Sequence, residues 1–186
     1  MKKNSVHLAL FFALAFLLTS PLAANAKEPK RGAYFEYGPL ETLTSQSLGP
    51  EGGSIVFDQK TSPLYGATLT FPAGALLQNT LVTVALQKGR LNLPDGRPHT
   101  APVFKITCGS LHELAQPLTI SFPHDFSRSS GGVAYAVERP DVASCTGSDC
   151  ETGSLEPLTT VAYGQKGGTI SAITFRAETT VTTVDH

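Results

Sequence analysis

The sequence predicts an all-β protein: a β-sandwich of about nine or ten short, mainly antiparallel strands. Many short runs alternate apolar and polar residues, which is the pattern of a strand buried on one face. The chain also contains 13 prolines and 17 glycines, which separate these runs at close intervals. No segment has the spacing of an amphipathic helix. Uneven strand lengths and long connections favour a sandwich over a barrel.

The first 26 residues have the pattern of a secretory signal peptide. Lys2 and Lys3 give a basic start, residues 8–18 are apolar, and Ala24-Asn25-Ala26 is a small-residue cleavage site. The apolar run is shorter than the roughly 20 residues that a membrane-spanning helix needs. We therefore expect cleavage after Ala26, export to the periplasm or the exterior, and no membrane span in the mature chain.

Residues 27–47 are predicted to form an N-terminal arm that leads into a first edge strand. This segment begins polar and basic and then becomes aromatic at Tyr34, Phe35 and Tyr37. The folded domain is expected to extend from Leu48 to His186.

The clearest strand pattern lies at residues 67–71, where Leu69 and Phe71 share one face. Pro72 ends this strand because it has no N–H to donate, and Gly74 supplies the freedom that a corner needs. Ile170 and Ile173 are three residues apart, which predicts a β-bulge or a bend. Further strands are expected near residues 53–58, 80–87, 103–108, 118–122, 133–137, 158–163, 168–175 and 179–184, with a loop at 88–102.

Three cysteines remain after the predicted cleavage. Cys145 and Cys150 flank a turn sequence and are a candidate disulfide in an oxidising compartment. Cys108 is in phase with Phe104 and Ile106, so we expect a buried free thiol there. A redox or intermolecular role for Cys108 is the alternative.

Charge and motifs narrow the classes of function. Removal of the leader takes two lysines from 14 basic residues and none from the 15 acidic ones, which leaves a net charge of −3. Because there is no basic patch, we expect no nucleic-acid partner. The metal-ligand and nucleophile motifs Cys-x-x-Cys, His-x-x-x-His and Gly-x-Ser-x-Gly are absent. We predict no catalytic residue, metal or cofactor, and interpret the histidines of the mature chain as loop or strand-end groups: His99, His112, His124 and His186.

Three landmarks resemble those of a known family. They are Gly52-Gly53 before a strand, the corner at residues 69–76 with Pro72 and Gly74, and residues 102–109 followed by 117–124. On these, the chain from about Leu48 to Asp125 resembles the ZU-five domain, the β-sandwich found in ankyrins and netrin receptors. The resemblance implies an interaction module that binds another protein. Some members of the wider family cleave themselves at a His-Phe-Ser step, but residues 173–177 lack that serine and histidine, so self-cleavage is not predicted.

We therefore expect an exported, non-catalytic β-sandwich module that binds another protein of the cell envelope or exterior. One alternative is a small secreted hydrolase or peptidase that uses His124, Asp125 and a loop serine. Another is carbohydrate binding through Tyr34, Phe35 and Tyr37.

Overall fold

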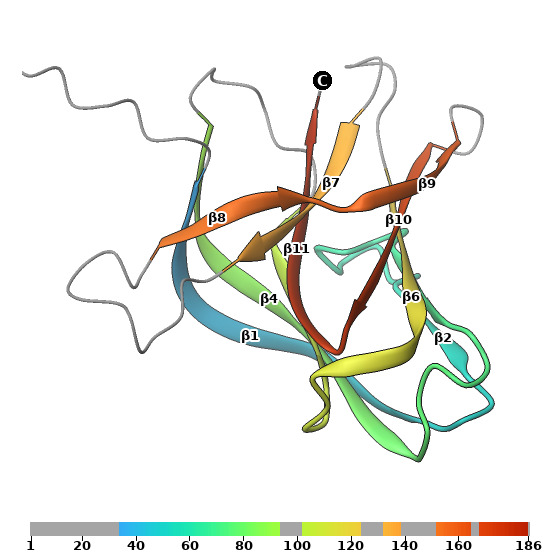
Figure 1. Cartoon of the computed structure of the whole chain (residues 1–186). Helices are drawn as coiled ribbons and strands as arrows, with labels where there is room; N and C mark the ends of the chain where they lie inside the picture. The colour runs from blue at the N-terminus through green and yellow to red at the C-terminus, as the bar shows by residue number, and fades with distance from the viewer. Residues whose placement is uncertain (1–33, 94–101, 124–131, 139–151, 165–167, 186) are drawn as a thin grey trace, which may run out of the picture. The chain divides into compact units, whose positions relative to one another are not determined.

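Two antiparallel sheets account for the described part of the chain (Figure 1). The computed structural model describes residues 34–93, 102–123, 132–138, 152–164 and 168–185, all within one unit, Arg31–His186. Eleven strands lie in these ranges: β1 (Tyr34–Leu48), β2 (Gly53–Val56), β3 (Thr68–Phe71), β4 (Thr80–Asn92), β5 (Phe104–Cys108), β6 (Glu113–Pro123), β7 (Gly132–Glu138), β8 (Thr152–Pro157), β9 (Thr159–Gly164), β10 (Thr169–Arg176) and β11 (Glu178–Asp185). No helix long and apolar enough to cross a bilayer occurs in these ranges.

The first sheet has the order β1-β4-β5-β11-β7-β8 and closes into a ring. The closure is short, because β1 pairs with β8 only from Tyr34 to Glu36. The second sheet is open, with the order β2-β3-β6-β10-β9. The predicted all-β class is confirmed, and a sandwich-like arrangement of the two sheets fits it. The closed ring is an addition to that prediction.

The main core lies between the two sheets. Apolar residues of the ring strands, such as Val82, Val84 and Ile106, belong to the same buried cluster as Leu69 and residues of the open sheet. Phe104 of β5 and Phe122 of β6 link the sheets directly, with ring centroids 5.7 Å apart. Full burial of one such side chain stabilises the fold by about 1.5–3 kcal/mol.

A second, smaller core fills one end of the ring. Its buried members are Phe35, Val103 and Val137, and Leu91 and Leu155 pack against them. The ring strands are therefore enclosed on both faces at this end.

Three local features differ from the sequence predictions. Residues 34–47 belong to a long strand that pairs with β4 along most of its length, so they form part of the sheet and not an arm that leads into it; beyond its short pairing with β8, this strand has one open edge. β4 continues to Asn92, into the expected loop, and β8 was not predicted. The expected irregularity is present between Ser171 and Ala172, in the pairing of β10 with β9. Ile170 is buried and Ile173 is partly exposed, so the two isoleucines lie on opposite faces of β10.

Candidate binding sites

The glycine pair and the proline–glycine corner form one structural unit. Gly53 pairs with Phe71, and the Gly74 N–H donates to the Pro50 carbonyl at 2.7 Å. Gly52 has a φ of 79°, and a Cβ atom there would lie 2.3 Å from the Phe71 carbonyl oxygen. Landmarks about twenty residues apart in the sequence are thus joined through the backbone.

A groove of about 420 Å³ lies between β1 and β2. Glu41, Leu43, Thr44 and Gln46 line it on the β1 side, and residues 55–59 and 61–63 line it on the other. Beyond its short pairing with β8, β1 is paired only with β4 among the described strands, so its other edge has no strand partner from Leu40 to Leu48.

β2 also has an open edge. It is the first strand of the open sheet and pairs only with β3 in the described structure. The Phe57 N–H donates to the Ala67 carbonyl at 3.0 Å, and the Phe57 carbonyl accepts from the Gly66 N–H at 2.7 Å, so Phe57 faces β3. Backbone groups alternate in direction along a strand, so those of Ser54 and Val56 face the open edge. An edge of this kind is a template for another strand.

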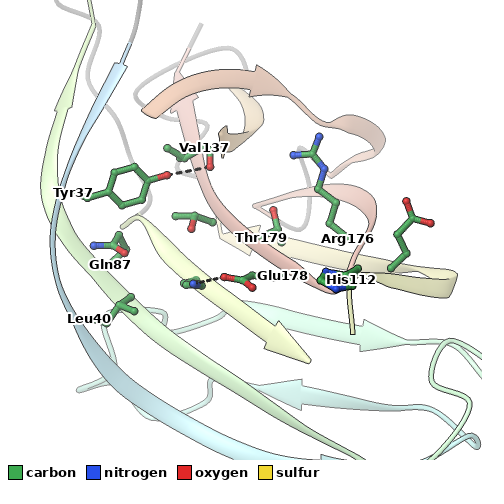
Figure 2. Close-up of a pocket in the computed structure, with 11 residues that line it drawn as sticks. Tyr37, Leu40, Gln87, His112, Val137, Arg176, Glu178 and Thr179 are labelled. Carbon is green, nitrogen blue, oxygen red and sulfur yellow. Dashed lines mark hydrogen bonds and ion pairs between the residues drawn. The ribbon is translucent and has the colours of Figure 1, made fainter. Parts of the chain in front are cut away.

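A cavity of about 500 Å³ opens at the ring (Figure 2). Figure 2 shows Tyr37, Leu40 and Gln87 on one side, and Arg176 and His112 on the other. Glu178 and Thr179 lie between these two sides in the same view.

Local contacts fix the Tyr37 side of the cavity. The Tyr37 hydroxyl donates to the Val137 carbonyl at 3.2 Å, and its ring packs edge-on against Phe35. The Gln87 amide donates to the carbonyls of Gly38 at 2.6 Å and Lys88 at 2.9 Å. These contacts hold the Tyr37 and Gln87 side chains in fixed positions.

Two ion pairs border the cavity. The Lys105 ammonium contacts the Glu178 carboxylate, and the Arg176 guanidinium lies 3.1 Å from the Glu156 carboxylate. The Lys105 side chain is 28% exposed, whereas that of Glu178 is 58% exposed. The cation therefore lies deeper than its partner.

The structure brings together only some of the predicted site residues. His112 lines the cavity and is exposed, and its carbonyl accepts from the Ala177 N–H at 3.1 Å. His99, His124, Asp125, His186, Cys145, Cys150 and the leader with Ala26 all lie outside the described residues. Within the described ranges, no three His, Cys, Asp or Glu side chains gather in a way that could hold a metal ion.

Two further candidates are buried. Phe35 is 1% exposed, so Tyr34, Phe35 and Tyr37 do not form an exposed aromatic platform for a sugar. Cys108 is a free cysteine with 0% exposure, and burial raises the pKa of its thiol from 9.0 to about 11. A thiol in that environment is a poor nucleophile at neutral pH.

Sequence reasoning missed Lys105, Gln87, Arg176 and Glu178 as cavity residues. Lys105 alternates with buried neighbours and was therefore expected simply to face outward. The enclosure is visible only in the structure, in β11, where residues 179–183 are all buried although four of the five are threonines. A strand buried on both faces indicates that its sheet encloses a second interior.

No protein-family model matches this chain, and a search of curated proteins found no match.

Proposed function

We propose that this chain is an exported, non-catalytic β-sandwich module of the ZU-five type that binds an extended segment of another envelope or extracellular protein. The open edge of β2 carries this proposal. The binding site is the groove between β1 and β2, and the segment adds to the sheet as a further strand.

Strand addition fits the chemistry of this edge. The backbone N–H and C=O groups of Ser54 and Val56 face away from β3 and are available to an incoming strand. Main-chain hydrogen bonds supply affinity in this mode, and pockets for alternate side chains supply specificity. The groove beside β2 offers such space, and the Val56 side chain is 58% exposed at its margin.

Two sequence features support the rest of the proposal. The basic start, apolar run and Ala24-Asn25-Ala26 site favour export. The Gly52-Gly53 pair and the corner at residues 69–76 resemble landmarks of the ZU-five domain, and that resemblance implies a module that binds another protein.

A matched pair of variants tests the binding mode. Val56→Pro removes the N–H that faces the open edge, whereas Val56→Ala keeps it, and proline is tolerated on edge strands where the N–H faces solvent. A displayed library of random 12-residue peptides is selected on the mature wild-type protein. We expect the selected peptides to bind Val56→Ala nearly as well as wild type and Val56→Pro at least about tenfold more weakly.

Unfolding in urea verifies that both variants are folded. Selected peptides that bind both variants equally would contradict strand addition at β2, as would selection that yields no binding peptide.

A further inference from the structure

The inner face of the ring carries a lysine. In β5, Phe104 and Ile106 face the core between the sheets, while Val103 belongs to the second core inside the ring. Side chains alternate along a strand. Lys105 therefore shares the inner face with Val103, and it lines the cavity.

The two cross-strand partners of Lys105 on that face are uncharged. Its cross-strand partners are Ala85 on β4 and Thr180 on β11, and Gln87 is buried nearby in the cavity wall. Glu178 supplies the opposite charge from a more exposed position.

The remaining charged residues that line the cavity lie at its rim. The Arg176 side chain is 44% exposed and is held by Glu156, and His112 and Glu113 are exposed. The deepest charge among the described lining residues is therefore the Lys105 ammonium.

The Tyr37 side of the cavity carries apolar groups beside the polar Gln87. Tyr37 has its hydroxyl engaged with the Val137 carbonyl. Leu40 also lines the cavity, and this apolar residue is 51% exposed to solvent. Together with Val137, these residues supply the apolar part of the lining of the cavity that holds the Lys105 ammonium group.

We propose that this cavity binds a small amphipathic carboxylate. The carboxylate replaces Glu178 as the partner of Lys105, and the hydrocarbon part lies against Tyr37, Leu40 and Val137. A volume of about 500 Å³ accommodates a molecule of this size, and ring mouths in β-proteins are a common place for such sites. The two carboxylates compete for one ammonium, so Glu178 weakens the binding that Lys105 provides.

Calorimetric titration of the mature protein with octanoate, at one fixed ionic strength, tests this site. We expect saturable binding of octanoate and much weaker binding of the uncharged octanol. Lys105→Gln is expected to weaken octanoate binding about tenfold or more, because a charge-assisted contact is lost. Lys105→Arg retains the charge and is expected to keep the binding.

Two further variants complete the design. Glu178→Gln removes the competing carboxylate and is expected to tighten octanoate binding severalfold. Lys88→Gln is the control, because Lys88 forms a similar ion pair with Glu41 but does not line this cavity; it is expected to bind octanoate as wild type does.

The proposal is overturned if wild type and Glu178→Gln show no saturable octanoate binding. It is also overturned if folded Lys105→Gln binds octanoate as wild type does, or if octanol binds equally well. If Lys105→Gln does not fold, the tighter binding expected of Glu178→Gln and the unchanged binding expected of Lys88→Gln decide the question.

Discussion

In the open sheet, β6 buries one face and leaves the other partly exposed, whereas β11 in the ring is buried on both faces. Leu118, Ile120 and Phe122 of β6 are at most 1% exposed, while Thr119 and Ser121 between them are partly exposed. In β11, every residue from 179 to 183 is buried. A strand such as β6 packs against one core, whereas a strand such as β11 packs against an interior on each of its two faces.

The two sheets also differ in whether their serine and threonine hydroxyls have hydrogen-bond partners. On the open sheet, Ser121 and Ser171 hydrogen-bond across strands at 2.7 Å, and Ser54 and Thr70 do so at 3.3 Å. On β11, the hydroxyls of Thr179 and Thr183 are buried without a partner in the described structure. Threonine has nearly the shape of valine but carries a polar group, so it fills a two-sided interior at some cost in stability.

The largest expected effect concerns the corner that begins the open sheet. Gly52→Ala places a Cβ against the Phe71 carbonyl in a left-handed conformation, so we expect it to lower the free energy of unfolding by roughly 3 kcal/mol or fail to fold. Gly74→Ala is the control, with a φ of 80° but nothing within 4 Å of the added atom, and we expect a loss of only about 1 kcal/mol. Urea unfolding measures both. Equal losses would mean that close contact at Gly52 does not organise the corner.

The next effect concerns Cys108, which faces the core between the sheets. The folded state keeps the thiol proton up to about pH 11, whereas the unfolded chain loses it above about pH 9. The contribution of the Cys108 thiol to the free energy of unfolding is thus fully present below pH 9. It falls by about 1.4 kcal/mol per pH unit as the pH rises from 9 towards 11. Urea unfolding of wild type and Cys108→Ala across this pH range separates the contribution of Cys108 from the contributions of other groups that titrate there. Parallel pH profiles of the two proteins would contradict the buried, neutral thiol.

Threonine-to-valine substitutions on β11 sharpen the comparison between the sheets. Thr183→Val removes a buried hydroxyl without a partner, so we expect the free energy of unfolding to rise by about 1 kcal/mol. Thr182 is also buried but has a partner, so Thr182→Val is expected to lower it by about 1 kcal/mol. Thermal and urea unfolding test both variants, and a destabilised Thr183→Val would show that its hydroxyl is satisfied.

The smallest effect is expected on the open sheet. Ser121→Ala breaks the hydroxyl pair with Ser171, but both residues are partly exposed and Ser171 can turn to water. We expect a loss of about 0.5 kcal/mol or less in urea unfolding. A loss as large as that of Thr182→Val would remove the distinction between the half-buried and the enclosed sheet.

The half-buried strands were the predictable part of this fold. Leu69 and Phe71 were expected on one inward face, and both are buried as the alternation indicates. β8 was not predicted because residues 152–157 include glycine and proline and do not alternate. Ring closure depends on pairing between Tyr34 and Ser154, which are 120 residues apart, and no local pattern encodes such a contact.

The cavity could not be predicted for the same reason. Lys105 between Phe104 and Ile106 has the pattern of an ordinary outward-facing residue, and only the closed ring turns that outward face into an interior. For the groove, the sequence predicted only the strand on one side, β2. The other wall is the middle of β1, and the polar residues of that segment had been assigned to an N-terminal arm.

Residue-resolved hydrogen exchange of the Ser54 and Val56 amides tests the central claim, that β2 offers an open edge to an extended partner. In the free protein, these two amides are predicted to exchange fast, while those of Ile55 and Phe57, which face β3, exchange slowly. Addition of a peptide selected on the wild-type protein is predicted to slow exchange at Ser54 and Val56. Strong protection of the Val56 amide in the free protein, or unchanged exchange at both sites with the peptide bound, would contradict the account.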